Sequence, residues 1–331
     1  MANDWQPGYI SLYQSGELAV RAQRLWQRLG ACDICPRECG DNRLKGKTGY
    51  CHSTAEPVVA SVCDHHGEEP VLSGSRGSGT IFFGNSNLRC RYCQNHQISQ
   101  DPKAQRVNRI DCSTLARHML HLQDDLGCHN INLVSPSHFV PQIVRALLEA
   151  IPQGLKIPLV YNSNAYDSLK TLKELDGVID IYLPDLKYAD DGHARKYSRA
   201  REYVRHSRAA IKEMYRQVGD LVVDEEGIAR RGLIVRHLIL PNGIAGSGES
   251  LTWLAAELSP QVSVSLMSQY HPTHKAYKYK ELSRPISPAE YDMALDTMTR
   301  AGLENGWAQE MPSNRNYLPD FDKNGHPFQP Q

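Results

Sequence analysis

The sequence contains no long apolar run and no excess of charge of either sign. A membrane-spanning helix needs about 20 mostly apolar residues, and no uninterrupted apolar run of the 331-residue chain approaches that length. Lysine and arginine together number 37, as do aspartate and glutamate, so no net field would attract nucleic acid or an anionic membrane. Charged residues, among them Glu17, Arg21 and Arg24, interrupt the apolar core that a signal peptide would need. We therefore expect a soluble cytoplasmic protein that binds neither nucleic acid nor membranes.

Signs of a disulfide framework and of a nucleotide-binding loop are also missing. An odd number of clustered cysteines in a chain without a secretion signal favours metal binding over disulfides. The glycine-rich stretch before Thr80 lacks the Gly-Lys-Ser/Thr ending of a phosphate loop, and no dinucleotide fingerprint follows the first predicted strand. The nine cysteines are Cys32, Cys35, Cys39, Cys51, Cys63, Cys90, Cys93, Cys112 and Cys128.

The N-terminal part combines a helical pattern with a cysteine-rich stretch. Residues 9–30 have apolar positions at helical spacing, which predicts one or two amphipathic helices. Four cysteines follow within 20 residues on turn-rich sequence, so a closed four-thiolate site is geometrically easy: Cys32, Cys35, Cys39 and Cys51. Zinc fits such a site, and so does an iron–sulfur cluster. The spacing does not choose between the two metals, and the alternative is four unrelated thiols.

From Thr80 onward, strand-like runs alternate with helical ones. The predicted strands are Thr80–Gly84, Asn130–Val134, Pro158–Asn162, Ile179–Leu186, Leu233–Leu240 and Val262–Tyr270, with helices near 113–126, 138–151, 167–176, 201–217, 249–258 and 288–301. Runs that are apolar at both odd and even positions, such as Leu233–Leu240, are typical of parallel strands covered on both faces. We predict an α/β fold, a partial (β/α)6 TIM-type barrel at 76–303, preceded by a small cysteine-rich region at 1–75 and followed by an irregular tail at 304–331.

Polar side chains collect at the predicted carboxyl ends of these strands, where reactive groups gather in parallel β/α folds. The second strand is followed by Ser135, Ser137 and His138, and the sixth carries Gln269. Alternation along the fourth strand places Asp185 and Lys187 on one face, as either an ion pair or a binding site. The cofactor-binding candidates are Asn162, Ser163, Asp185, Lys187, Arg236 and His237. No catalytic residue is predicted.

The turn from Asp64 to Pro70 holds two histidines and three carboxylates. No helical or strand spacing aims these groups at one another. We expect solvated or locally hydrogen-bonded side chains there, rather than a metal site.

The loop after the first predicted strand carries Cys90 and Cys93. Two thiols at this spacing can grip one metal centre, and they can also form a redox disulfide. A thiol–disulfide oxidoreductase is the weaker hypothesis, because its motif normally precedes a smaller thioredoxin-like unit than six β/α repeats.

From about Cys32 to Leu303 the sequence resembles the radical S-adenosylmethionine (SAM) family. Within it, the chain looks like the branch similar to pyruvate formate-lyase activating enzymes, with an extra N-terminal cysteine region. The segments that carry the likeness are Cys32-Asp-Ile-Cys35-Pro-Arg-Glu-Cys39, Gly67–Pro70, Asn87–Asn95, Asn130–Val134, Asp180–Tyr188 and Arg236–Pro241. Two positions depart from the family pattern: Leu133–Pro136 replaces a Gly-Gly-Glu segment, and Ser86 replaces the first cysteine of the C-x3-C-x2-C cluster loop.

The resemblance implies a 4Fe-4S cluster held at Ser86, Cys90 and Cys93, with one iron left open for the methionyl amine and carboxylate of SAM. Reductive cleavage of SAM then gives a radical that abstracts hydrogen from a carbon of a protein substrate, as in glycyl-radical activation. Asp185 and Lys187 would contact the methionyl end, and His237 would face the same cavity. The implied partners are the protein substrate and a reductant such as flavodoxin or ferredoxin.

A serine hydroxyl is far less acidic than a thiol and a harder donor, so it matches a thiolate-held cluster poorly. Three outcomes are open. Ser86 ligates as an alkoxide, another thiol such as Cys63 completes the site, or the site is defective. The alternative function is therefore a non-catalytic Fe–S or zinc-binding scaffold with a degenerate radical SAM site.

Overall fold

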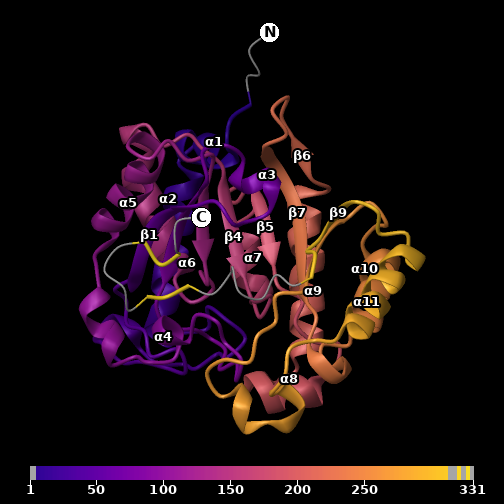
Figure 1. Ribbon diagram of the computed structural model, residues 1–331. Coiled ribbons are helices and arrows are strands. Elements are labelled where there is room, and N and C mark those ends of the chain that lie inside the picture. Colours follow the sequence, from indigo (N-terminus) through magenta and orange to yellow (C-terminus); the bar gives the residue numbers. More distant parts are fainter. Residues whose placement is uncertain (1–4, 312–318, 322–325, 329–331) are drawn as a thin grey trace.

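The computed structural model describes residues 5–311, 319–321 and 326–328, and its central element is one mixed sheet (Figure 1). The strand order is β1-β2-β3-β4-β5-β7-β8-β9, with β6 paired to β7. All neighbours from β2 to β9 along this path are parallel, whereas β1 and β6 are antiparallel to their partners. The strands are β1 (Val59–His65), β2 (Ser78–Phe83), β3 (Ile131–Val134), β4 (Leu159–Ser163), β5 (Ile181–Pro184), β6 (Val222–Val223), β7 (Ala229–Leu238), β8 (Ser263–Met267) and β9 (Gly306–Ala308).

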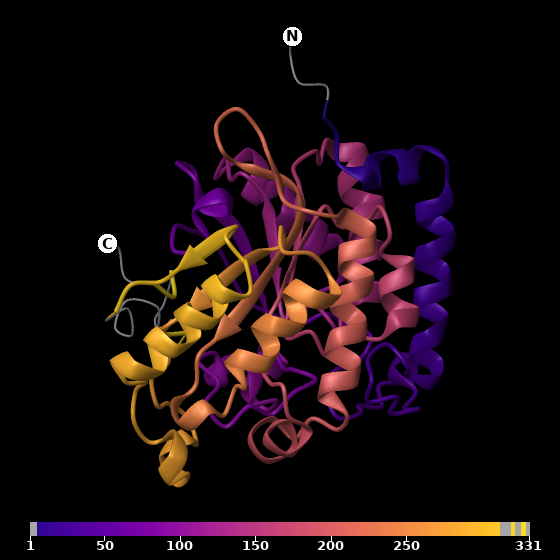
Figure 2. The ribbon, with the colours of Figure 1, turned by 90° about the vertical axis from the view of Figure 1, so that its right-hand side faces the viewer.

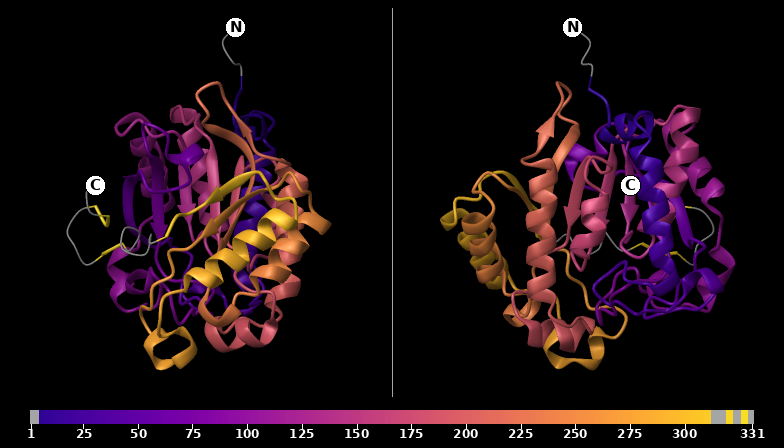
Figure 3. Two further views of the ribbon diagram at one scale, coloured as in Figure 1. Left: turned by 45° about the vertical axis from the view of Figure 1, so that its right-hand side comes forward. Right: turned by 180° about the vertical axis from the view of Figure 1, so that it is seen from behind.

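The longer helices cover one face of the sheet (Figures 2 and 3), whereas the short α3 packs Leu72 against the opposite face. The helices are α1 (Gly8–Gln14), α2 (Glu17–Gln27), α3 (Pro70–Ser73), α4 (His96–Ser99), α5 (Cys112–Asp124), α6 (Val140–Ala150), α7 (Leu169–Glu174), α8 (Asp191–Ser198), α9 (Tyr203–Val218), α10 (Ser247–Glu257) and α11 (Pro288–Arg300). Within the described part of the chain, no helix combines the length and apolarity needed to cross a bilayer.

All six predicted strands are present, and each is followed by a helix near its predicted position. The short strands β3, β4 and β5 are buried at every residue, which explains their apolar runs. Side chains set several helix starts: Asp111 accepts a hydrogen bond from the Thr114 amide at α5, and Ser287 forms a capping box with Glu290 at α11. The prediction of a parallel α/β fold is confirmed.

The sheet extends beyond the predicted core at both ends. β1, from the predicted N-terminal region, pairs with β2, so the boundary at residue 75 does not separate this region from the sheet. The prediction of an irregular tail from residue 304 is wrong for β9, which pairs with β8. Gly306 has a φ of 142°, and any Cβ there would collide with the backbone of Val264. Glycine thus permits a close approach that its usual role in turns did not predict.

Candidate functional site

Polar side chains from several strands line one cleft of about 800 Å³. Asn162 lies at the end of β4, Asp185 directly after β5, Arg236 on β7 and Gln269 just beyond β8. Lys187 lines the same cleft. The prediction that the carboxyl ends of the strands bring these five residues together agrees with their positions. The size is within the usual range for small-molecule and cofactor sites.

Arg236 is the centre of a charged network in this cleft. Its Nε donates to Oδ1 of Asp185 at 2.9 Å, and its Nη2 donates to Oδ1 of Asn162 at 2.7 Å. Its Nη1 lies 3.3 Å from Oε2 of Glu68. The other carboxylate oxygen of Asp185 accepts from Nζ of Lys187 at 2.8 Å. Asp185 therefore joins two cations whose remaining N–H groups can serve a ligand.

The network stays ionised although it is largely buried. Burial raises the pKa of Asp185, but Arg236 and Lys187 lower it more, so the net pKa is below its usual value. Burial likewise lowers the pKa of Lys187, but Asp185 and Cys90 together raise it more, so the net pKa is above its usual value. Each charge is held by an opposite charge at short range, which is what a buried ion pair requires. The site therefore presents fixed cationic donors to the cleft.

Cys90 and Cys93 lie on the loop between β2 and α4, close to Lys187. The Sγ of Cys90 accepts from the Ser198 hydroxyl at 3.1 Å, and the Sγ of Cys93 lies 3.2 Å from Oγ of Ser99. Burial raises the pKa of Cys93 to about 11, Cys90 adds to this rise, and Lys187 is among the groups that oppose it. The next two residues of the loop, 94 and 95, line the cleft. The two thiols thus stand together at its edge.

Ser86 is buried and engaged within its own loop, where its Oγ accepts a hydrogen bond from the Leu88 amide at 3.1 Å. Cys63 lies on β1 opposite Thr80 and packs in an apolar cluster with Phe82, whereas Cys90 belongs to a different cluster. In the part of the chain that the structure describes, no group of three or more His, Cys, Asp or Glu side chains is arranged to hold a metal ion. The donor set fits a 4Fe-4S cluster at two of its three expected positions.

Two predicted site residues point away from the cleft. The Ser163 hydroxyl donates to Oδ2 of Asp167 at 2.7 Å. His237, predicted to face the same cavity as Asp185, does not line this cleft: its Nδ1 donates to the Leu186 carbonyl at 2.7 Å, and its Nε2 lies 2.9 Å from Oγ of Ser247. Burial lowers the pKa of His237 to about 4, so the ring is neutral. Adjacent residues on a strand face opposite sides, and Arg236 occupies the cleft side.

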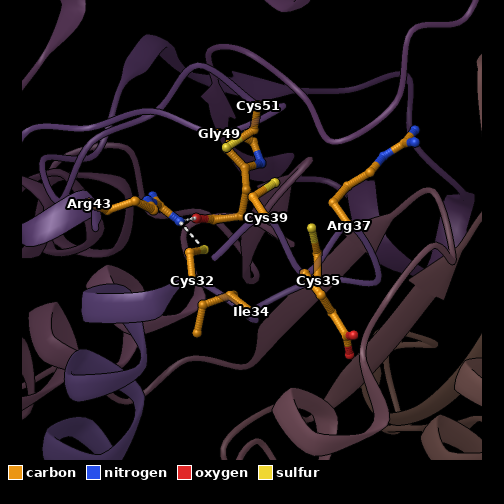
Figure 4. Close-up of a pocket in the computed structure, with 10 residues that line it drawn as sticks. Cys32, Ile34, Cys35, Arg37, Cys39, Arg43, Gly49 and Cys51 are labelled. Carbon is orange, nitrogen blue, oxygen red and sulfur yellow. Dashed lines mark hydrogen bonds between the residues drawn. The ribbon is translucent and has the colours of Figure 1, made fainter. Parts of the chain in front are cut away.

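The four N-terminal cysteines line a second, small pocket (Figure 4). Figure 4 shows the sulfur atoms of Cys32, Cys35, Cys39 and Cys51 around one space. The free volume there is about 10 Å³, room for one atom of about the size of water. Burial, with Cys51 and the other two cysteines adding to it, raises the pKa of Cys35 well above its usual value.

Donors already point at these thiols. The Tyr50 amide donates to Sγ of Cys39 at 3.3 Å, and Nη1 of Arg43 lies 3.8 Å from Sγ of Cys32. Burial raises the pKa of Cys39, and the hydrogen bond from the Tyr50 amide offsets this only in part. The pocket has room for one small ion, although no three side chains among the described residues are arranged to hold a metal as they stand.

The cysteine pocket is tied to the Ser86–Cys93 loop. Nε of Arg37 donates to the Asn87 carbonyl at 3.0 Å, and Nη2 of Arg89 donates to the Tyr50 carbonyl at 2.6 Å. Both guanidinium groups lie over the Tyr50 ring. His138, expected at the cleft, instead lines the cysteine pocket, and its Nε2 lies 3.1 Å from the Gly84 carbonyl.

Sequence reasoning missed the acidic side of the cleft. Glu68, Glu69 and His65 line it and are largely buried, so they are not solvated. The other expected alternative, local hydrogen bonding, holds for His66, whose Nε2 lies 3.1 Å from Oδ2 of Asp64. Periodicity gave no signal, because the turn reaches the cleft through the antiparallel pairing of β1 with β2. The available signal in the sequence was a pair of adjacent carboxylates before an apolar turn. Burying such carboxylates costs free energy unless they are paired with other groups.

The chain has only limited similarity to known proteins in sequence and in structure. No protein-family model matches the chain. The uncharacterized protein MJ0674 of Methanocaldococcus jannaschii is 27% identical over 277 residues, which cover 82% of this chain and 75% of that protein. Among solved structures, HydG, a maturase of the FeFe-hydrogenase, gives a TM-score of 0.45 at 12% identity, covering 71% of this chain and 52% of HydG. Methylornithine synthase (PylB) gives 0.44 at 14% identity, covering 73% of this chain and 75% of PylB.

Proposed function

We propose that this chain is a radical SAM enzyme that binds SAM in the cleft between the carboxyl ends of its parallel strands, in a partial (β/α)6 barrel. The observation that carries the proposal is the ion-pair network of Lys187, Asp185 and Arg236 beside the paired thiols Cys90 and Cys93. Cationic donors suit the carboxylate of the SAM methionyl group. Thiols at the cleft edge suit an iron–sulfur centre next to it.

The chain's own residues have separable tasks in this proposal. Asp185 fixes the positions of Lys187 and Arg236, so that their free N–H groups meet a ligand without reorganisation. Apolar side chains that line the cleft, among them Phe82 and Trp307, keep water away from the reacting groups. A 4Fe-4S cluster at Cys90 and Cys93 would supply the electron for reductive cleavage of SAM.

We extend the proposal to a glycyl-radical-activase-like reaction on a protein substrate, with flavodoxin or ferredoxin as reductant. The support is the likeness in the Asn87–Asn95 and Asp180–Tyr188 segments. The cleft, about 800 Å³, lies in the upper part of the size range of ligand sites, so we expect room for a substrate group beside SAM. At the N-terminal pocket we propose one zinc ion held by Cys32, Cys35, Cys39 and Cys51, because the free volume suits a single ion.

The engagement of Ser86 with Leu88 favours a second candidate function. In that case the chain is a non-catalytic zinc-binding or Fe–S scaffold that keeps the fold and the N-terminal site. Such a scaffold has no need of an ionised cationic network in a large cleft, so SAM binding separates the two candidates.

The test is calorimetric titration of SAM into the anaerobically purified protein and into Lys187→Met. Loss of a charge-assisted hydrogen bond costs roughly 1.5–3 kcal/mol, so we expect SAM binding to weaken about 10- to 100-fold. Lys212→Met, which removes an exposed lysine on α9, should bind SAM like the wild type. Undetectable SAM binding by the wild type, or equal affinity of Lys187→Met, would contradict the proposal.

A further inference from the structure

The segment that follows β8 carries positive charge without a carboxylate of its own. Residues 271–280 contain three lysines and two histidines and neither aspartate nor glutamate. The whole chain, by contrast, has 37 basic and 37 acidic residues. The segment lies at the same end of the sheet as α4 and α8 (Figures 1 and 3). Positive charge is therefore concentrated at this end of a chain that is neutral as a whole.

This segment is fastened to the loop that carries the paired thiols. The Lys275 amide donates to the carbonyl of Arg91, a residue between the two cysteines of the loop, at 2.8 Å. The His274 ring stacks on the ring of His96, the first residue of α4, with 5.0 Å between the ring centroids. The lysines of the segment are thus held beside the cysteine loop.

The side chains of the segment divide into an inner and an outer set. The Tyr279 ring packs edge-on against Tyr197 of α8, with 5.5 Å between the ring centroids. Lys278 and Lys280, which flank Tyr279, are exposed, and Tyr277 is 62% exposed. We call the outer set the cationic surface: Arg91, Lys275, Lys278 and Lys280, with Tyr277 among them.

The charge of the cationic surface is not balanced within the chain. None of its four cations has a carboxylate partner among the described residues. Two carboxylates adjoin the surface, and both are engaged: Glu281 pairs with Lys196, and Asp320 accepts from the Gln97 amide at 3.2 Å. The pKa of His274 is lowered to about 4, first by burial and then by His96 and three cations of the surface. A positive potential therefore remains at this face.

The thiols lie directly behind this surface. The Sγ of Cys90 accepts from the hydroxyl of Ser198, the last residue of α8, at 3.1 Å. Arg91, the next residue along the loop, belongs to the cationic surface, and its amide donates to the Tyr197 carbonyl at 2.7 Å. A partner bound to the surface is therefore separated from Cys90 by little more than the loop and the end of α8.

We propose that the cationic surface docks an acidic electron-carrier protein. The choice of an electron carrier rests on the proposed function, which places an iron–sulfur centre at Cys90 and Cys93 and needs a reductant. Cations around an exposed tyrosine resemble the polar rim and aromatic centre of a protein interface. Charge of opposite sign on the partner speeds the encounter and fixes the orientation in which the two proteins meet.

The test titrates an acidic flavodoxin into the full-length protein and measures binding by calorimetry. The wild type should bind it, with an affinity that falls about tenfold or more when salt screens the charges. Lys278→Glu combined with Lys280→Glu should weaken binding about tenfold or more, because like charges then face each other. The matched control is Lys156→Glu combined with Lys173→Glu, which changes the net charge equally at exposed lysines outside the surface and should bind like the wild type. Tyr277→Ala should weaken binding roughly fivefold without any change of charge.

Equal flavodoxin affinity of the Lys278/Lys280 variant and of its control would overturn the inference, as would absence of flavodoxin binding by the wild type. Single-stranded RNA that binds more tightly than flavodoxin and displaces it would assign the surface to nucleic acid and overturn the inference too. Flavodoxin binding that depends on Lys278 and Lys280, in a protein that binds no SAM, would overturn the proposed function alone. SAM binding without lysine-dependent flavodoxin binding would overturn the inference alone.

Discussion

Ser86 is one hydroxyl oxygen in the place where the resemblance implies a thiolate. Its Oγ accepts a hydrogen bond from the Leu88 amide, which shapes the start of the loop that carries Cys90 and Cys93. Cysteine differs from serine only by sulfur in place of oxygen. We therefore expect Ser86→Cys to change the metal-binding chemistry of the side chain and to leave its position almost unchanged.

We therefore expect Ser86→Cys to raise the iron bound per chain after anaerobic reconstitution by roughly twofold or more, because thiolate is the better ligand for iron. Ser86→Ala is the matched control. Unchanged iron in Ser86→Ala shows that the hydroxyl is no ligand, whereas loss of iron shows that it ligates. Iron content and visible absorption provide the measurement. No gain in Ser86→Cys would contradict a vacant third position.

His237 is expected to matter for stability and not for SAM. Burial lowers its pKa to about 4, against 6.5 for an unperturbed histidine. The unfolded chain therefore takes up a proton as the pH falls below about 6.5, whereas the folded chain does not until about pH 4. Stability is lost across this window, by on the order of 3 kcal/mol.

His237→Gln removes this titration, so its stability should fall less steeply between pH 6.5 and 4 than that of the wild type. At pH 7.5 it should unfold more easily, because buried hydrogen bonds are lost. Thermal unfolding across the pH range measures both effects. SAM affinity should stay within about twofold, and a larger loss would place His237 in the binding site after all.

Alternation along a strand was enough to predict Asp185 and Lys187 as a pair on one face. Both Arg236 and His237 were predicted to bind the cofactor, although alternation places adjacent residues of a strand on opposite faces. Which of the two faces the cleft depends on Asp185 and Glu68, which pair with Arg236 across the cleft. The adjacent carboxylates Glu68 and Glu69 were a signal in the sequence, but the burial of Glu69 was not predictable, because it depends on how α3 packs against distant strands.

At the scale of elements, the N-terminal cysteine segment supports the loop that carries Cys90 and Cys93. Arg37, between two of the pocket cysteines, binds the Asn87 carbonyl, and Arg89 binds the carbonyl of Tyr50, the residue before Cys51. A metal ion in the pocket would fix Arg37 and Tyr50 and, through them, the loop.

We expect Cys51→Ser to lose the zinc of this pocket and to lower the unfolding temperature by roughly 5 °C. Iron binding at Cys90 and Cys93 should fall in parallel, because the loop loses its support. Cys112→Ser is the control, since Cys112 begins α5 and does not line the pocket. Metal analysis and thermal unfolding decide it: full iron content in a zinc-free Cys51→Ser protein would refute this supporting role.

The six β/α units were predictable because each contains an apolar strand-like run and a helical pattern within its own stretch of sequence. β9 was not, since Gly306, Trp307 and Ala308 show no strand pattern and gain their structure only from β8. α3 is four residues long, too short for a periodic signal, and its place depends on long-range packing.

At the scale of the whole molecule, the sheet brings together three regions that lie apart in the sequence. The cysteine pocket supports the β2–α4 loop from outside. The carboxyl ends of the strands present the cationic network, and the β1–α3 turn closes the cleft with carboxylates. We therefore assign the end of the cleft beside the Cys90–Cys93 loop to SAM.

The most direct test of the central claim is Mössbauer spectroscopy of the anaerobically reconstituted protein before and after addition of SAM, together with Cys93→Ala. We predict a 4Fe-4S signal in which SAM alters one iron, and loss of that signal in Cys93→Ala while zinc stays bound. Zinc without SAM-responsive iron, or an iron signal unchanged in Cys93→Ala, would contradict the claim that this cleft is a radical SAM site.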